Sequence, residues 1–119
     1  MKETVIDLDA LSNLKAVIGD DPAMLAEFFD VFTRSVPGQV ENMRTAQEAG
    51  DLANLRIAAH SCKSNARDLG ALVLADLCAT LEDQSRSGKL VDPVGQIALI
   101  DAEATRAVEA LNGLDPSRV

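Results

Sequence analysis

The sequence predicts an all-α protein, an up-and-down four-helix bundle with additional short N-terminal and C-terminal helices. Its hydrophobic content is 47%, yet only 3% of the residues are aromatic, all of them Phe. Such an aliphatic composition, rich in Ala and Leu, favours helices that pack on helices. No run of β-branched residues alternates with period two, as a half-buried strand requires. A chain of 119 residues can bury one core but not two, so we expect a single domain over residues 1–119.

The N-terminal part begins with a short amphipathic helix over 7–18. A second helix starts at Asp21-Pro22, an N-cap followed by proline at the first helical position. We expect this helix to break near Pro37, because proline has no backbone N–H to donate. Its predicted inward stripe consists of Leu25, Phe28, Phe29 and Phe32.

Four further helices are delimited by Gly, Asp and Pro residues in the same way. Short connections make successive helices antiparallel neighbours, which gives the up-and-down arrangement. The tail 113–119 is expected to fray. The predicted ranges are a third helix that ends near Ala49, a fourth over 52–69, a fifth over 72–87 and a last one over 93–112.

The helix over 52–69 contains the only histidine of the chain, His60. This residue lies one position, or about 100°, away from the apolar stripe of its helix, so its ring is expected to face water. Three cations lie within two turns of it, and no acid occurs between Asn54 and Arg67, although the chain carries a net charge of −8. The stripe consists of Leu52, Leu55, Ala59, Cys62, Ala66 and Leu69, and the cations are Arg56, Lys63 and Arg67.

This pattern alone leaves two interpretations of His60 open. A lone histidine on an amphipathic helix is most often a solvated surface residue. The neighbouring cations, however, disfavour a protonated ring and can hold an anion that is delivered to it. A neutral imidazole among cations is suited to nucleophilic attack on a phosphoryl group.

Glu82 is the carboxylate that the fold is expected to bring to His60. The turn at Gly70-Ala71 folds its two flanking helices together, and His60 and Glu82 are equally distant from residue 71. If Glu82 accepts a hydrogen bond from Nδ1 of His60, Nε2 is left unprotonated and directed outward. An ordinary solvated helix acid is the alternative, and the spacing leaves both open.

The same counting places the two cysteines opposite each other. Cys62 and Cys78 are equally distant from Gly70, and both lie on inward stripes. We expect buried, reduced thiols, because the N-terminus is too polar for an export signal. A metal site is not expected, since His60 and Cys62 point to different faces and no second histidine exists.

Charge and hydropathy exclude two classes of partner. Three cations on one helical face are too few to hold a nucleic acid duplex, and the acidic balance of the chain argues against one. No apolar run approaches the roughly 18 residues of a membrane span. We therefore expect a cytoplasmic protein with no nucleic-acid or membrane partner.

One segment carries a family signature. It reads Ala59-His60-Ser61-Cys62-Lys63-Ser64-Asn65-Ala66-Arg67-Asp68-Leu69-Gly70-Ala71, and Leu81-Glu82 follows in the next helix. This segment resembles the signature A-H-x-L-K-G-x-A-x-x-L-G-A of histidine phosphotransfer (HPt) domains. The resemblance covers 7–87 as the family module, on which helix 93–112 would pack. Two positions differ, with Cys62 for a customary Leu and Ser64 for a Gly that allows close approach of a partner.

The resemblance implies a phosphocarrier rather than an enzyme, with no kinase motif. A phosphoryl group would pass from the aspartyl phosphate of one receiver domain to His60 and on to the Asp of another. Lys63 would bind phosphoryl oxygens, and Glu82 would orient the ring. No cofactor is implied on this chain, and Mg²⁺ is expected on the receiver domain. The candidate partner-binding residues around His60 are Arg56, Ile57, Ser64 and Arg67.

The expected partners are response-regulator receiver domains and a hybrid histidine kinase, and the chain is expected to be a monomer. Two other functions are compatible with a helical bundle. An HPt-like adaptor would bind a receiver or kinase without ever holding phosphate. A bundle that holds a cofactor on His60 is disfavoured by the outward position of the ring and by its cationic neighbours.

Overall fold

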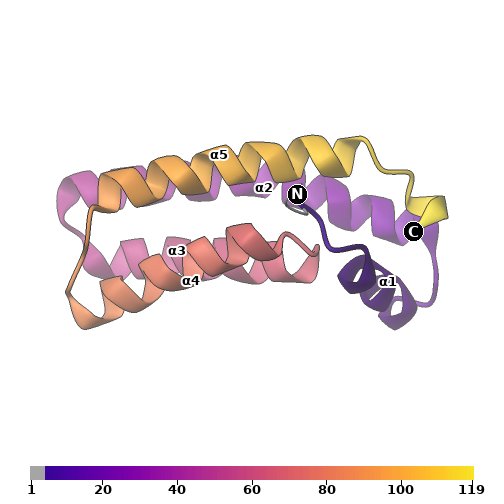
Figure 1. The fold of residues 1–119 in the computed structure, drawn as a ribbon, viewed down its shortest axis with the longest axis horizontal. Helices are drawn as coiled ribbons and strands as arrows, with labels where there is room; N and C mark the ends of the chain where they lie inside the picture. Colours follow the sequence, from indigo (N-terminus) through magenta and orange to yellow (C-terminus); the bar gives the residue numbers. More distant parts are fainter. Residues whose placement is uncertain (1–4) are drawn as a thin grey trace, which may run out of the picture.

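The computed structural model describes residues 5–119 as five α-helices and one short 3₁₀ helix (Figure 1). The predicted all-α fold is confirmed, and the described residues contain no strand. None of the described helices combines the length and the hydropathy needed to cross a membrane. The elements are α1 (Leu8–Val17), α2 (Pro22–Ala49), α3 (Leu52–Asp68), α4 (Leu72–Ser87), α5 (Pro93–Asn112) and η1 (Pro116–Arg118).

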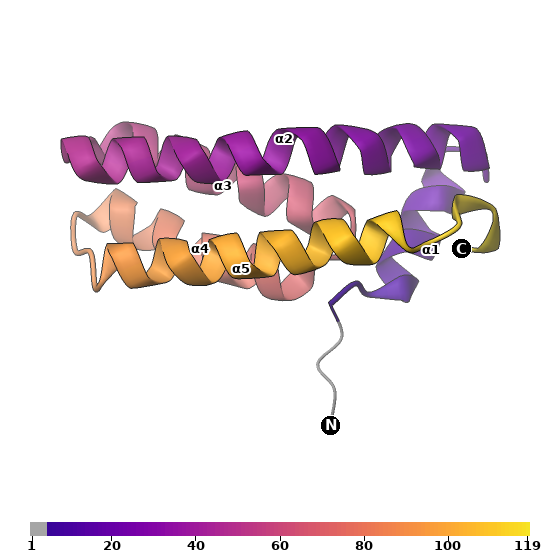
Figure 2. The same ribbon diagram turned by 90° about the horizontal axis from the view of Figure 1, so that it is seen from above.

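Four of these helices form the bundle. Each of α2, α3 and α4 packs against the next helix in the chain, and α5 packs back against α2 and closes the ring. Figure 2 shows α2 and α5 running side by side, with α3 and α4 behind them. The short helix α1 lies at the end of the bundle that α3 and α4 do not reach (Figure 1). The largest side chains buried between the helices include Phe32, Met43, Leu55, Leu74, Leu81 and Ile100.

The predicted break near Pro37 is wrong, because α2 continues through it from Pro22 to Ala49. Proline in a helix interior costs about 3 kcal/mol. The inward stripe continues beyond it, with Val40 and Met43 at most 1% exposed. Burying each such side chain contributes about 1.5–3 kcal/mol, so the packing of the stripe outweighs the lost hydrogen bond. Pro37 itself lies on the exposed side, as does Phe28, which was predicted to point inward and is 37% exposed.

The C-terminal tail is also more ordered than the sequence suggested. The expectation that 113–119 frays is wrong, because η1 packs against α2. Leu114 and Val119 contact the core, and Lys15 Nζ donates a hydrogen bond to the carbonyl oxygen of Val119 at 3.1 Å. With 22–49 forming one helix, α5 is the fourth helix of the bundle, and α1 and η1 are the short additional elements.

The turn between α3 and α4 depends on Gly70. Its φ is +76°, in the region that favours glycine, and the Asp7 N–H donates to its carbonyl oxygen at 2.8 Å. A Cβ at this position would lie 2.6 Å from the Asp7 carbonyl oxygen, so only glycine fits. The N-terminal segment thus anchors the turn that sets the register of α3 against α4.

Candidate functional site

His60 lies near the middle of α3, directly after the fully buried Ala59. Its side chain is 57% exposed, and its Nδ1 lies 2.8 Å from Oε2 of Glu82 on α4. Glu82 is only 3% exposed, so this contact ties a surface ring to a buried carboxylate. The contact occurs at the level that the α3–α4 turn predicts. A carboxylate accepts the hydrogen bond, so Nδ1 carries the proton and Nε2 is the nitrogen left for a partner.

Two further side chains contact the Glu82 carboxylate. Lys63 of α3 places its Nζ 2.6 Å from Oε1, and Arg86, one turn further along α4, places Nη2 3.1 Å from Oε2. Burial alone would raise the pKa of Glu82. The contacts from Lys63 and His60 outweigh burial and hold the pKa below its ordinary value of 4.5. Glu82 is therefore ionised at neutral pH.

This arrangement suits an attack by Nε2 on an electrophile. When Nε2 donates its electron pair, the ring becomes positively charged, and the Glu82 carboxylate already lies against Nδ1 to stabilise that charge. The ring is also held in one tautomer and one orientation before the partner arrives. The same contact therefore both orients the nucleophile and compensates the charge that it develops.

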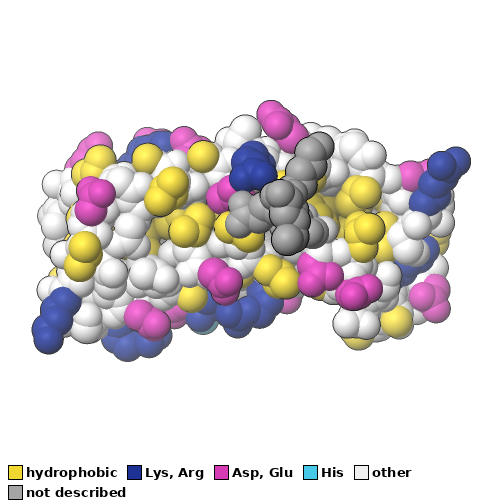
Figure 3. All heavy atoms as spheres, viewed as in Figure 1, with side chains coloured by type: hydrophobic (Ala, Val, Ile, Leu, Met, Phe, Trp, Pro, Cys, Tyr) yellow, Lys and Arg dark blue, Asp and Glu magenta, His cyan; other side chains and the backbone are white. Residues whose placement is uncertain are grey.

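Of the remaining predicted residues around His60, three are exposed and Arg56 is half-buried. The side chains of Arg56 and Arg67 form no hydrogen bond or ion pair with any residue from 5 to 119. Ile57 is 53% exposed, and Ser64 is exposed. In Figure 3, Lys and Arg side chains gather along the edge that α3 and α4 form. These positions leave all four residues free to meet a partner.

The sequence prediction missed two contacts at this site. Arg86 was not a candidate, although it follows Glu82 by four residues, the spacing at which opposite charges pair on a helix. Lys63 was assigned to phosphoryl oxygens alone, whereas in the structure it binds Glu82 across the hairpin. Lys63 follows His60 by one helical turn, so the α3–α4 turn that brings Glu82 to His60 also brings Glu82 near Lys63. This spacing was the signal available in the sequence.

Comparison with known proteins decides the family. The family model described as "Hpt domain" matches residues 27–111. The chain belongs to the Hpt domain family. It is therefore a histidine phosphotransfer protein of phosphorelays, as the resemblance around His60 implied. Members of this family are phosphocarriers that work with receiver domains and hybrid histidine kinases.

Two solved structures resemble this Hpt domain. Histidine-containing phosphotransfer protein B (HptB) from Pseudomonas aeruginosa PAO1 superposes with a TM-score of 0.85 at 25% identity, over 99% of both chains. The HPT domain of the Hpt sensor hybrid histidine kinase from Shewanella has a TM-score of 0.71 at 19% identity, over 89% of this chain and 93% of that one. The second likeness supports the fold alone. No curated protein sequence matches the chain significantly.

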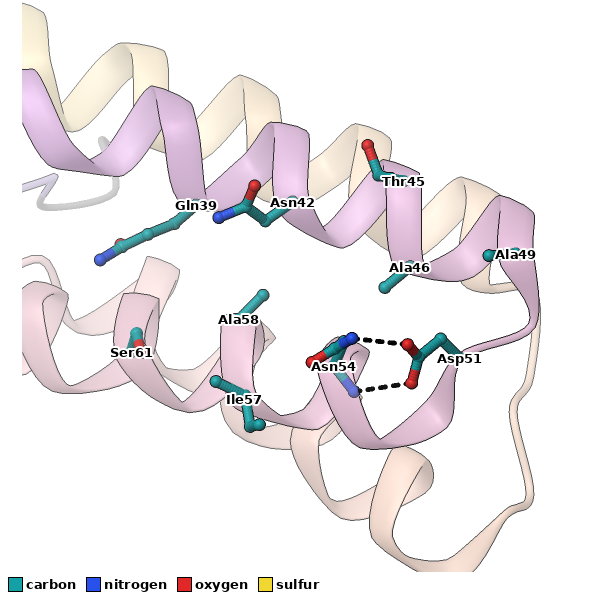
Figure 4. A pocket seen from close by; sticks show the side chains of 10 residues that line it. All are labelled: Gln39, Asn42, Thr45, Ala46, Ala49, Asp51, Asn54, Ile57, Ala58 and Ser61. Carbon is teal, nitrogen blue, oxygen red and sulfur yellow. Dashed lines mark hydrogen bonds between the residues drawn. The ribbon is translucent and has the colours of Figure 1, made fainter.

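A groove lies between α2 and α3, and its lining includes Ser61, the residue after the histidine of this Hpt domain (Figure 4). Its volume is about 480 Å³. Gln39 extends from α2 toward α3, and its buried Oε1 has no hydrogen-bond partner among the described residues. The only charged residue of the lining, Asp51, caps α3 by accepting from the Asn54 N–H at 3.0 Å. The lining consists of Gln39, Asn42, Thr45, Ala46, Ala49, Asp51, Asn54, Ile57, Ala58 and Ser61.

The two cysteines of the Hpt domain are free and buried, as predicted. The two thiols are close enough across the α3–α4 hairpin for each to shift the pKa of the other. Within residues 5–119, no cluster of three or more His, Cys, Asp or Glu side chains is arranged to hold a metal ion. The cysteines therefore belong to the core between the two helices that carry His60 and Glu82.

Proposed function

We propose that His60 is the residue on which this Hpt domain carries its phosphoryl group. The observation that carries the proposal is a solvent-exposed imidazole whose Nδ1 is held 2.8 Å from a buried, ionised carboxylate. The donor is the aspartyl phosphate of one receiver domain, and the acceptor is the aspartate of another. The chain carries phosphate between them and needs no nucleotide for either step.

The transfer step uses one electron pair of the ring. The lone pair of His60 Nε2 attacks phosphorus, and the bond from phosphorus to the aspartyl oxygen breaks with its electrons remaining on the receiver carboxylate. Nδ1 keeps its proton, which Glu82 continues to accept as the ring becomes positive. The onward transfer is the same step in reverse, with the carboxylate of the second receiver as nucleophile. Mg²⁺ belongs to the carboxylates of the receiver, and no cofactor is required on this chain.

The cations of α3 act on the phosphoryl oxygens and on the partner. Lys63 uses one contact on Glu82 and has two further N–H groups for phosphoryl oxygens. Arg56 and Arg67, whose side chains have no partner in residues 5–119, supply positive charge to an acidic receiver rim. On the other side of His60, Ile57 and Ser64 make the docking contacts.

We propose that the Hpt domain acts in the cytoplasm as a monomer.

Phosphoryl transfer from a charged receiver tests the proposal. A receiver domain is loaded with labelled phosphate from an acyl phosphate and mixed with the Hpt domain, which is then scored for acid-labile, base-stable label. The wild type should be labelled, and His60→Gln should not be. Gln can still donate a hydrogen bond to Glu82 and occupies an exposed position. The free energy of unfolding, measured in urea, should therefore change by no more than about 0.5 kcal/mol.

Two results would contradict the proposal. Label that persists on folded His60→Gln would place the phosphoryl group elsewhere on the chain. Binding of receivers without any label on the wild type would favour the adaptor function, in which the Hpt domain never holds phosphate.

A further inference from the structure

Two thiols lie inside the α3–α4 hairpin, close to His60, but they take no part in the proposed phosphoryl transfer. Cys62 and Cys78 are the only cysteines of the chain, and both side chains are fully buried. The two thiols face each other across the hairpin, close enough for each to shift the pKa of the other. Two cysteines in contact in an otherwise cysteine-free chain can react with each other and with no other thiol of the same molecule.

The fold holds these thiols at one level. The tight turn at Gly70 makes α3 and α4 antiparallel neighbours, and these two helices pack more extensively than any other pair. Both helices bury alanines, Ala59 and Ala66 on α3 and Ala75 on α4, each at most 1% exposed. Small side chains let helix axes approach closely, and a disulfide requires Cα atoms about 4.4–6.8 Å apart.

The two thiols are not equivalent. The neighbouring Cys78 thiol lowers the pKa of the Cys62 thiol against the opposing effect of burial. The neighbouring Cys62 thiol, burial and the nearby charge of Glu82 raise the pKa of the Cys78 thiol far above its ordinary range. Cys62 is therefore the thiol that ionises first, and the thiolate is the nucleophile in cysteine oxidation.

We propose that Cys62 and Cys78 form an oxidative modification site, at which a hydroperoxide such as hydrogen peroxide produces an intramolecular disulfide between α3 and α4. The Cys62 thiolate attacks one peroxide oxygen, the O–O bond breaks, and a proton converts the leaving hydroxide to water. The Cys78 sulfur then displaces the hydroxyl of the Cys62 sulfenic acid as a second water, forming the S–S bond. Two thiols are oxidised and one peroxide is reduced to two waters.

The disulfide would change the site that carries His60. Cys78 lies one helical turn before Glu82, and Cys62 directly precedes Lys63. An S–S bond is about 2.05 Å long, whereas unbonded atoms stay about 3.5–4.0 Å apart. We expect the bond to turn both side chains and draw the helices together at this level, which would disturb the contacts of His60 and Lys63 with Glu82. This consequence rests on the proposed function of His60, but the disulfide itself does not.

Mass spectrometry of the intact protein tests the modification. The reduced wild type is treated with hydrogen peroxide, unfolded and exposed to a maleimide. We expect a mass lower by two hydrogens, no maleimide uptake, a crosslinked peptide pair containing Cys62 and Cys78, and full reversal by dithiothreitol. Cys62→Ala and Cys78→Ala are the matched variants, and neither should lose two hydrogens. The peptide mapping uses the wild type, so it decides the outcome even if a variant fails to fold.

Three results would overturn the modification site. They are uptake of maleimide by both thiols after peroxide treatment, conversion to sulfinic acids without a crosslink, and disulfide-linked dimers in place of the internal bond.

Transfer from a charged receiver tests the consequence at His60. We expect the oxidised wild type to accept phosphate about tenfold more slowly than the reduced protein, because a displacement of ~1 Å at a reacting group can slow a reaction by up to about 10²-fold. Peroxide treatment of folded Cys62→Ala should leave its rate unchanged. Equal rates for a fully crosslinked and a reduced wild type would overturn the coupling but not the disulfide. A reduced wild type that accepts no phosphate would instead contradict the function of His60.

Discussion

On the α4 side of His60 the side chains are charged and paired, whereas on the α2 side they line an open groove and are neutral except for the helix-capping Asp51. Glu82 is contacted by His60, Lys63 and Arg86 at 2.6–3.1 Å and is buried beneath them. The groove toward α2 contains Gln39, whose buried Oε1 lacks a partner within the described chain. The ion pairs on the α4 side are already formed in the isolated molecule, whereas no ion pair within residues 5–119 orders the side chains of the groove.

This difference separates two requirements of phosphoryl transfer. The groups that orient the nucleophile and compensate its charge must be in place before the partner arrives, because reorganising them during the reaction slows it. The groups that recognise the partner need no fixed contacts within the chain, because docking itself supplies their contacts. We therefore expect substitutions on the α4 side to affect stability and the transfer step, and substitutions on the α2 side to affect docking.

The largest expected effect is the loss of stability in Glu82→Ala. Removing one partner from a buried ion pair leaves the other charge unpaired and costs about 3–5 kcal/mol, and we expect the low end because Lys63 is 19% exposed. Urea unfolding measures this change. Asp83→Ala is the matched control, since the Asp83 side chain is 74% exposed and its loss should change stability by less than about 0.5 kcal/mol. Equal losses for the two variants would mean that the Glu82 contacts contribute little.

The contribution of Glu82 should also depend on pH. Its pKa in the folded protein is lower than its ordinary value of 4.5, so the folded state favours the ionised form. The resulting stability is present above the ordinary value and is lost as the pH falls through the lowered pKa. The difference in unfolding free energy between the wild type and Glu82→Gln should thus shrink as the pH falls below the ordinary value of 4.5. A difference that stays constant over the whole range would contradict the direction of the shift.

Lys63→Ala should slow transfer more than Arg56→Ala. Lys63 contacts Glu82 and is proposed to bind phosphoryl oxygens, whereas Arg56 contacts no other side chain in the described part of the protein by hydrogen bond or ion pair. Loss of one charged donor in a partly exposed site corresponds to roughly a tenfold lower rate, the low end for such groups. Because this effect concerns the chemical step, it should persist at saturating receiver. Recovery of the wild-type rate at high receiver concentration would mean that Lys63 acts in docking and not in the chemical step.

Ser64→Gly should have a small effect on stability. Glycine in a helix interior lowers stability by about 0.5–1 kcal/mol relative to Ala, and slightly less relative to Ser. It also removes an exposed hydroxymethyl group beside His60, so receivers should dock more readily and half-saturate transfer at a lower concentration. Ser64→Leu is the matched opposite change and should obstruct docking. If Ser64→Leu transfers as well as the wild type, residue 64 lies outside the docking surface.

The pairing of His60 with Glu82 could be predicted because it depends on few variables. A tight turn at Gly70 sets the register, and helical periodicity sets the face of each residue. The choice among partners could not be predicted in the same way. Lys63 and Arg86 both reach Glu82, but which cations bind a carboxylate depends on side-chain rotamers that sequence spacing does not determine.

The errors in the fold have a common physical cause. Pro37 breaks a helix by its local preference, and the tail 113–119 has little propensity of its own. In both cases tertiary packing decides, because the buried stripe of α2 continues past Pro37 and η1 packs on α2. Local signals thus predicted the α3–α4 hairpin well, where they agree with the packing, and failed where burial at long range opposes them.

The nitrogen that carries the phosphoryl group tests the central claim most directly. The phosphorylated Hpt domain can be labelled with ¹⁵N, and the coupling of phosphorus to the ring identifies the bonded atom without ambiguity, because His60 is the only histidine. The account predicts phosphorus on Nε2, with Nδ1 still protonated and hydrogen-bonded to Glu82. Phosphorus on Nδ1, or on a residue other than His60, would contradict it.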